Sequence, residues 1–356
     1  MIYFDNAATA SELPWQAGDG LLGNPSSPHG LGIQAERKMD AARKTIADIL
    51  CVQPRELTFT SGGTESNNMA ILGFAKAHAR QSCVIFAEPW EHPSIIEPIK
   101  NAQDAMAVIA PMAEWHIPPD RPSLVCLSHV NHETGRKMPC PKNFKDAGAV
   151  VLVDGAQGFC KEAIDLRYVD AYSFSGHKFH GPGGVGGFWL RPGFKVNPLL
   201  YGGGQEGGLR PGSENLSGIL KMAAAAEAVT ASQPNISEIN TELRNIINEL
   251  PDVFINSPDD ASAYILNISF MGVNGETLVH LLSEKEVYVS MGAACRSRKK
   301  VKSGLELIGH SQDRAKAAVR FSFSIYNNID EARRVKALLV ENVSQLRRVL
   351  GYRGMK

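Results

Sequence analysis

Short apolar runs alternate with segments of helical periodicity over the first two thirds of the chain. Runs that are apolar on both faces are typical of strands covered by helices on both sides. Between them, apolar residues recur at the i, i+3, i+4 spacing of helices. The expected strands are residues 57–60, 84–87, 123–127 and 150–153, and the expected helices are residues 33–50, 66–79, 93–102 and 217–231. This alternation predicts an α/β fold with a mostly parallel sheet.

The pattern changes near residue 235, where the alanine-rich helix breaks in a Ser-Gln-Pro-Asn segment. At 356 residues the chain exceeds the usual size of a single core. We therefore expect a large domain of residues 14–235 and a smaller α+β domain of residues 1–13 and 236–356. The expected elements of the smaller domain are helices over 236–250, 275–285 and from Asp330, and strands near 263–270, 287–290 and 317–324.

Charge and cysteine content exclude several classes of function. Lysine plus arginine and aspartate plus glutamate both number 37, so net charge provides no reason for direct binding to nucleic acid or a membrane. The cysteines form no Cys-x-x-Cys pair, and we expect no metal site. The N-terminus has no basic segment before an apolar core, and no apolar stretch approaches the ~18 residues of a membrane span. We expect a cytoplasmic protein.

A carboxylate at the end of an expected strand, Asp154, is followed along the chain by a lysine in a polar turn, Lys178. Lys178 stands in a Ser-Gly-His-Lys turn, and Asp154 directly follows the expected strand 150–153. The cofactor pyridoxal phosphate needs an amine that forms a Schiff base with its aldehyde and a carboxylate that keeps its pyridine nitrogen protonated. The residues between them leave room for another strand and a turn. Taken alone, either residue also fits a surface lysine or an ordinary strand end.

A glycine-rich turn upstream suits a phosphate group. Residues 60–68 follow an expected strand and open an expected helix, so the backbone N–H groups near Gly63 and the Thr64 hydroxyl lie at a positive helix end. Ser175 and His177 can complete such a site beside Lys178. Packing alone also explains a glycine-rich turn of this kind.

Two polar residues follow other expected strands. His92 comes soon after strand 84–87, at the edge where open α/β sheets bind ligands, and we expect it to be a catalytic residue, because an imidazole there can stack on a flat ring and move protons. Asn131 follows strand 123–127 and can bond a cofactor oxygen or a substrate carboxylate. The alternatives are a structural histidine and a polar turn.

The order of these motifs resembles that of the cysteine desulfurases in the class V aminotransferase-like group. The resemblance extends from about residue 3 to residue 345. The motifs that carry it are Asp5-Asn6-Ala7-Ala8-Thr9, Asn24-Pro25-Ser26-Ser27-Pro28-His29, residues 60–68, Glu91-His92, Val130-Asn131, Asp154-Gly155-Ala156-Gln157, Ser175-Gly176-His177-Lys178, the loop 202–215, residues 289–295 and Arg320-Phe321-Ser322.

The resemblance implies a fold type I pyridoxal phosphate enzyme, with a sheet of the seven-stranded type in the large domain, that forms a homodimer. It implies that Lys178 holds the cofactor covalently, that Asp154 pairs with the ring nitrogen and that His92 stacks on the ring. Asn131 and Gln157 would bond the ring's oxygen side. The implied phosphate ligands are Gly63, Thr64, Ser175 and His177, together with Ser213 from the partner chain.

The resemblance also implies the reaction, which converts L-cysteine into L-alanine and a persulfide on Cys295. It places the nucleophilic Cys295 and the carboxylate-binding Arg320 in the smaller domain, and it places Asn131 and Asn6 at the substrate. A guanidinium suits a carboxylate because it forms a two-pronged pair. Persulfide sulfur would pass to an acceptor protein for iron–sulfur cluster assembly or tRNA thiolation, through a carrier rather than by direct contact with RNA.

The run from Arg296 to Lys302 departs from the more neutral continuation of the family. Its positive charge would lower the pKa of the Cys295 thiol, and it suits either a landing site for an acidic sulfur acceptor or a solvated loop. The alternative functions are a selenocysteine lyase, another class V lyase or aminotransferase, and a catalytically silent homologue that binds partners.

Overall fold

The structure is a computed structural model that describes residues 1–14, 23–232, 235–291 and 302–354. The chain forms two compact units. The larger unit comprises Ser11–His129 and Met138–Ala231, and the smaller comprises Met1–Ala10, Val130–Lys137 and Ser232–Lys356. This division differs from the expected one chiefly at residues 130–137, because Val130 packs with Ala7 and Ile265 of the smaller unit.

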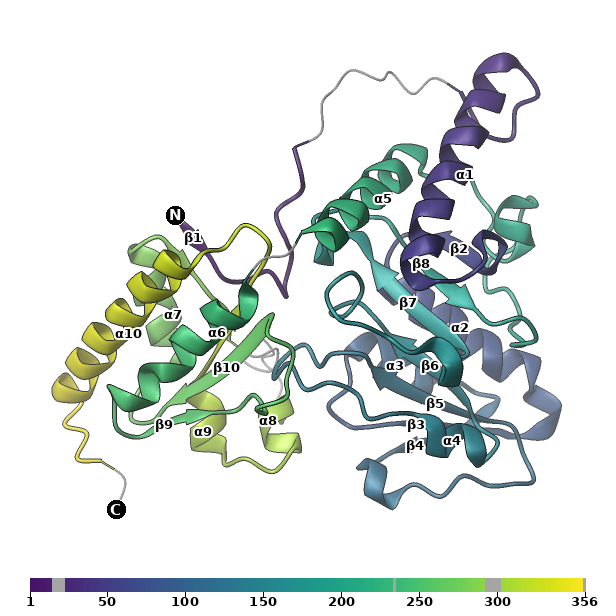
Figure 1. The fold of residues 1–356 in the computed structure, drawn as a ribbon. Helices are drawn as coiled ribbons and strands as arrows, with labels where there is room; N and C mark the ends of the chain where they lie inside the picture. Colours follow the sequence, from purple (N-terminus) through teal and green to yellow (C-terminus); the bar gives the residue numbers. More distant parts are fainter. Residues whose placement is uncertain (15–22, 233–234, 292–301, 355–356) are drawn as a thin grey trace. The chain divides into compact units, whose positions relative to one another are not determined.

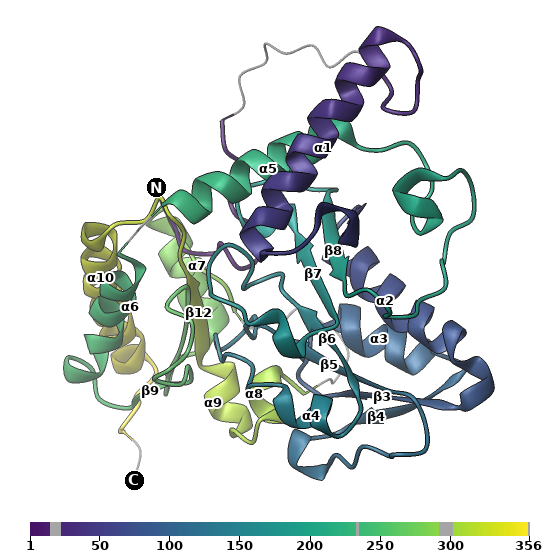
Figure 2. The same ribbon diagram turned by 45° about the vertical axis from the view of Figure 1, so that its right-hand side comes forward.

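A seven-stranded sheet forms the centre of the larger unit, with strand order β2-β8-β7-β6-β5-β3-β4 (Figures 1 and 2). The pairs among β4, β3, β5, β6 and β7 are parallel, and β8 is antiparallel to both of its neighbours. The predicted α/β class is confirmed. The strands are β2 (Leu57–Thr60), β3 (Cys83–Ala87), β4 (Ala105–Ile109), β5 (Ser123–Ser128), β6 (Val150–Asp154), β7 (Ala171–Ser175) and β8 (Gly186–Leu190).

Helices pack on this sheet through apolar side chains. Phe74 of α2 and Ile95 of α3 belong to one core cluster with Ile85, Leu124 and Leu152 of the sheet. Helices α1 and α5 lie side by side in both views (Figures 1 and 2). The helices of this unit are α1 (Gly30–Leu50), α2 (Gly63–Ala77), α3 (Pro93–Asn101), α4 (Lys142–Asp146) and α5 (Leu216–Ala231).

The smaller unit contains a three-stranded antiparallel sheet of order β12-β10-β9, formed by Ala318–Ser322, Ile265–Phe270 and Val253–Ile255. A short parallel pair joins β1 (Ile2–Tyr3) to β11 (Val287–Tyr288). The helices are α6 (Ile236–Arg244), α7 (Gly275–Glu284), α8 (Gly304–Leu307), α9 (Gln312–Lys316) and α10 (Ile329–Val349). The expected helix over 236–250 ends its α-helical part at Arg244 and continues as a 3-10 turn over Asn245–Asn248.

Phe4, Leu266, Leu282, Phe321 and Leu339 are buried together in the core of the smaller unit. Phe4 follows β1 directly, and Phe321 lies on β12, so this core ties the N-terminal segment to the last strand of the sheet. Within the described parts of the chain, no helix is long and apolar enough to cross a membrane.

Candidate active site

Asp154 lies at the carboxyl end of β6 and is buried. Its Oδ1 accepts a hydrogen bond from the Ala156 N–H at 2.9 Å, and its Oδ2 accepts one from Asn67 Nδ2 at 2.9 Å. Two donors from different elements therefore fix the direction of the carboxylate. Gln157 is buried in the turn that follows β6, three residues after Asp154.

Lys178 lies at the same edge of the sheet as Asp154. Strands β6 and β7 are parallel neighbours in which Asp154 is paired with Ser173, and β7 runs directly into the turn Gly176–Lys178. Parallel strands bring their carboxyl ends to one edge, where α/β sheets bind ligands. The strand and turn expected between these two residues are present.

His92 caps the N-terminus of α3 and lines an open cavity between α2 and α3 together with Thr64. His92 is exposed to this open cavity, but the surrounding protein atoms still remove part of the water around its ring. Desolvation lowers the pKa of His92, the charge of Asp154 acts to raise it and the charge of Lys178 lowers it. The fold thus brings His92, Asp154 and Lys178 within electrostatic reach of one another. Glu91, just before His92, is buried.

The glycine-rich turn leads from β2 into α2, as expected. Gly62 has a φ of 153°, and no side chain caps the helix at this residue. Ser175 borders the turn, because a Cβ atom built on Gly62 would lie 3.4 Å from Ser175 Oγ and one on Gly63 would lie 3.6 Å from Ser175 Cβ. The N-terminus of α2, which includes Thr64, therefore faces a hydroxyl group.

Lys178 acts electrostatically on two other basic side chains, His177 and Lys161. Burial, Lys178 and Lys161 lower the pKa of His177 to about 4. Burial and Lys178 lower the pKa of Lys161 to about 8. A positive helix end, a hydroxyl group and a cluster of basic groups are the donors that a phosphate group requires, so these residues fit the phosphate of the expected cofactor.

The loop of residues 202–215 is held by ion pairs. Arg43 forms a two-pronged pair with Glu206, with distances of 2.9 and 2.6 Å, and Glu206 Oε2 also accepts the Phe59 N–H at 2.9 Å. Arg210 pairs with Glu65 of α2 at 2.9 Å. Ser213 is exposed on this loop.

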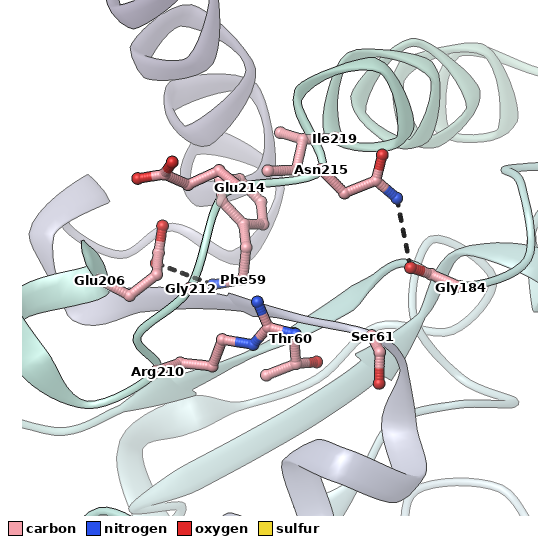
Figure 3. Close-up of a pocket in the computed structure, with 10 residues that line it drawn as sticks. All are labelled: Phe59, Thr60, Ser61, Gly184, Glu206, Arg210, Gly212, Glu214, Asn215 and Ile219. Carbon is pink, nitrogen blue, oxygen red and sulfur yellow. Dashed lines mark hydrogen bonds between the residues drawn. The ribbon is translucent and has the colours of Figure 1, made fainter. Parts of the chain in front are cut away.

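Figure 3 shows the small pocket beneath the loop, where Asn215 donates to the Gly184 carbonyl at 3.3 Å. Glu214 Oε2 is buried and has no hydrogen-bond partner among the described residues. The pocket is lined by Phe59, Thr60, Ser61, Gly184, Glu206, Arg210, Gly212, Glu214, Asn215 and Ile219.

Arg320 is buried on β12 of the smaller unit. Its Nη1 donates to the His132 carbonyl at 2.8 Å, and its Nη2 donates to Asp5 Oδ1 at 2.9 Å. Its Nε is buried without a partner in the described part of the chain. Ser290 exchanges backbone hydrogen bonds with Arg320, and Cys295 itself lies outside the described residues.

The two asparagines expected at the substrate both belong to the smaller unit. Asn6 Nδ2 donates to the carbonyls of Ser322 at 2.9 Å and Tyr3 at 3.1 Å, so backbone atoms occupy its amide nitrogen. Asn131 Oδ1 accepts the Glu133 N–H at 3.0 Å and two donors from Thr134. This oxygen is therefore committed to the local turn, and only Nδ2 of Asn131 remains to donate to a ligand.

Four residues around the site received no role from the sequence, namely Asn67, Ser94, Glu91 and Lys161. Asn67 stands in the glycine-rich motif and Glu91 directly precedes His92, whereas Ser94 follows His92 by two residues and Lys161 follows Gln157 by four. Their proximity in the sequence to His92, Asp154 and Thr64 was the available signal. Their roles depend on contacts between elements that are distant in the sequence.

Comparison with known proteins identifies the family. The model of the class V aminotransferase family matches residues 2–335. The NifS/IcsS protein homolog of Lactobacillus delbrueckii subsp. bulgaricus is 35% identical, over 93% of this chain and 94% of that protein. The cysteine desulfurase IscS of Pectobacterium atrosepticum is 32% identical, over 97% of this chain and 93% of that protein.

Solved structures of similar proteins share the fold. A NifS-like protein superposes with a TM-score of 0.84 at 30% identity, covering 97% of this chain and 99% of that one. SspA in complex with cysteine superposes with a TM-score of 0.79 at 30% identity, covering 92% of this chain and all of that one (100%).

Class V aminotransferases are pyridoxal phosphate enzymes, so the cofactor expected from the sequence is confirmed for the family. The carboxylate of Asp154, the lysine at the same sheet edge and the two basic side chains on which this lysine acts fit this cofactor. The family model matches residues 2–335, and the curated relatives are 35% and 32% identical to this chain, so both comparisons indicate the same family. This chain belongs to the class V aminotransferase family.

Proposed function

We propose that this protein is a cysteine desulfurase that converts L-cysteine into L-alanine and a persulfide on Cys295. The observation that carries the proposal is the buried Asp154 carboxylate, which two donors orient at the sheet edge occupied by Lys178. The curated relatives named cysteine desulfurase and the solved relative that binds cysteine support the substrate.

Each residue has a separate task in the proposed reaction. Pyridoxal phosphate, when bound, supplies the electron sink that makes the bonds at Cα of the substrate labile. The Lys178 amine takes the Cα proton, and Asp154 holds the proton on the ring nitrogen. Arg320 holds the substrate carboxylate, and its Nε, which has no partner among the residues that the structure describes, is a donor for that purpose.

The sulfur is transferred to Cys295. The Cys295 thiolate forms a bond to the substrate sulfur, the bond between that sulfur and the substrate Cβ breaks, and the electron pair stays with the carbon skeleton. Protonation of that skeleton then yields alanine. The attacking group must be a thiolate, which the positive charge of residues 296–302 would favour.

The remaining partners also belong to this proposal. A second copy of the chain would place its exposed Ser213 at the phosphate of the first, and Asn131 and Gln157 would bond the ring's oxygen side. The persulfide would pass to an acceptor protein in the reducing environment of the cytoplasm, where a free Cys295 thiol persists.

Turnover of L-cysteine tests the proposal. We expect equal amounts of alanine and sulfide in the presence of a reductant, loss of both in Cys295→Ala, and loss of both together with the cofactor absorbance band in Lys178→Ala. Cys140→Ala is the matched control, because Cys140 is an exposed free cysteine. Alanine formation that persists in Cys295→Ala would contradict the persulfide mechanism.

A further inference from the structure

Asn67 joins three elements of the larger unit through one buried amide. Its side chain is fully buried, at 0% exposure. Its Nδ2 lies 2.9 Å from Asp154 Oδ2 on β6 and 2.9 Å from Ser94 Oγ on α3. Its Oδ1 lies 2.6 Å from Ser173 Oγ on β7.

The partners of Asn67 determine where the hydrogens lie. A carboxylate oxygen accepts hydrogen bonds, so the amide nitrogen must face Asp154. Its two hydrogens then go to Asp154 and to Ser94 Oγ, while the Ser173 hydroxyl donates to Oδ1. Both hydrogens of Nδ2 are therefore donated, and Oδ1 accepts from Ser173.

The chain of hydrogen bonds extends from Asn67 through Ser94 to His92. Ser94 Oγ accepts from Asn67, so its own hydrogen is available for His92 Nδ1, which lies 2.8 Å away. The Ser94 backbone N–H donates to the same nitrogen at 3.1 Å. Two donors at Nδ1 require it to be unprotonated, which leaves the hydrogen of a neutral imidazole on Nε2.

We propose that Asn67 and Ser94 are positioning residues that hold His92 as the neutral Nε2–H tautomer and connect it to the carboxylate of Asp154. His92 then donates through Nε2 and is not a base, because a proton on Nδ1 would face the backbone N–H of Ser94. The assignment of Cα proton removal to Lys178 alone rests on the proposed function, whereas the tautomer does not.

The charged groups around His92 agree with a neutral ring. Desolvation has the largest effect and lowers the pKa of the imidazole, whereas the charge of Asp154 on β6 raises it and that of Lys178 after β7 lowers it. Glu91, the preceding residue, is buried and binds Ser128 rather than His92. The hydrogen bonds donated to Nδ1 and the burial of the ring therefore both favour the neutral imidazole.

Nitrogen-15 NMR of histidine-labelled, full-length protein as purified tests this inference. The His92 signals are identified by their absence in His92→Gln. We expect Nδ1 to have the shift of an unprotonated nitrogen and Nε2 that of a protonated one. A proton on Nδ1 with an unprotonated Nε2 would overturn the proposal. Because this measurement needs no turnover, a protein without desulfurase activity still gives the same result.

Variants test the role of the two positioning residues. Ser94→Ala removes one donor to the neutral ring, so the pKa of His92 should rise by about one pH unit, and Ser94→Thr should restore the original titration. Asn67→Ala should shift it in the same direction. Ser66→Ala is the matched control, because this neighbouring buried hydroxyl binds Thr60 and Gly62 instead.

An unchanged His92 titration in Ser94→Ala would overturn the proposal, as would an equal shift in Ser66→Ala. If Asn67→Ala fails to fold, the pair Ser94→Ala and Ser94→Thr decides the question, since Ser94 lies near the start of α3 and its backbone N–H is retained in both variants.

Discussion

Arg320 Nη2 lies 2.9 Å from Asp5 Oδ1, and these two side chains are largely buried, at 7% and 17% exposure. The arginine that would bind the substrate carboxylate is thus already paired with one carboxylate of the protein. Nη1 binds the His132 carbonyl, and Nε is the guanidinium nitrogen that has no hydrogen-bond partner among the described residues. Asp5 therefore orients Arg320 and also places a negative charge near the expected substrate.

Arg320→Lys should raise KM for L-cysteine by about 10- to 100-fold, because hydrogen bonds to a charged group contribute roughly 1.5–3 kcal/mol and each 1.4 kcal/mol is tenfold in affinity. A lysine keeps the charge but not the planar guanidinium, which binds Asp5 and the His132 carbonyl and would bind the substrate as well. Steady-state alanine formation measures the effect. Arg314→Lys is the control in the same unit, since Arg314 binds Asn256 and the Ile255 carbonyl instead.

Asp5→Asn should act in the opposite direction on KM. The amide still accepts the hydrogen bond from Arg320, but the negative charge that opposes a second carboxylate is gone. We expect KM to fall by about three- to tenfold with little change in kcat. Asp330→Asn is the control, because it neutralises an exposed aspartate paired with Arg333 in the same unit. A rise in KM in Asp5→Asn would mean that orientation of Arg320 outweighs its charge balance.

Glu206→Gln should destabilise the larger unit by about 3–5 kcal/mol, the usual cost of leaving one member of a buried ion pair alone. The side chains of Arg43 and Glu206 are only 13% and 3% exposed. Urea unfolding measures the loss. The double variant Arg43→Met with Glu206→Met should lose less than Glu206→Gln, because no unpaired charge stays buried. Glu97→Gln breaks an exposed pair with Lys100 and should change stability by under about 1 kcal/mol.

The carboxyl group of Glu91 should make stability depend on pH. Burial raises its pKa from 4.5 to about 8, although the Ser128 N–H and hydroxyl both donate to it. Between these two values the folded state keeps a proton that the unfolded state has released. The free energy of unfolding that this group contributes is therefore fully present below pH 4.5 and is lost as the pH rises to about 8.

Glu91→Gln removes this dependence and tests it. The free energy of unfolding of the variant relative to the unaltered protein should increase by about 1.4 kcal/mol for each pH unit between pH 5 and 8. Urea unfolding at three pH values in this window measures the slope. Glu114→Gln, which alters an exposed carboxylate, should show no such slope. A constant difference between Glu91→Gln and the unaltered protein would show that Glu91 is ionised throughout.

The sequence predicted the buried elements better than the exposed or glycine-containing ones. Strand β3 was expected within one residue of its bounds, because all five of its residues are buried and apolar on both faces. Strand β8 was not expected, since Gly186 and Gly187 lack the side chains that reveal a strand. Strand β4 was missed as well, because it lies at the sheet edge with Met106 and Ala107 exposed and has no alternating pattern.

The sequence by itself determined the α/β class and the family, and its motifs identified Lys178, Asp154 and His92. These features depend on periodicity and short motifs, which involve only residues close together in the chain. Only the tertiary structure decided which residues contact these three and which contact Arg320. Asn67 reaches Asp154 across 87 positions of sequence, and Arg320 reaches Asp5 across 315. Such contacts follow from the order of strands in each sheet and from the packing of helices on it. Both depend on the burial of residues that are distant in the sequence, which a local sequence pattern does not predict.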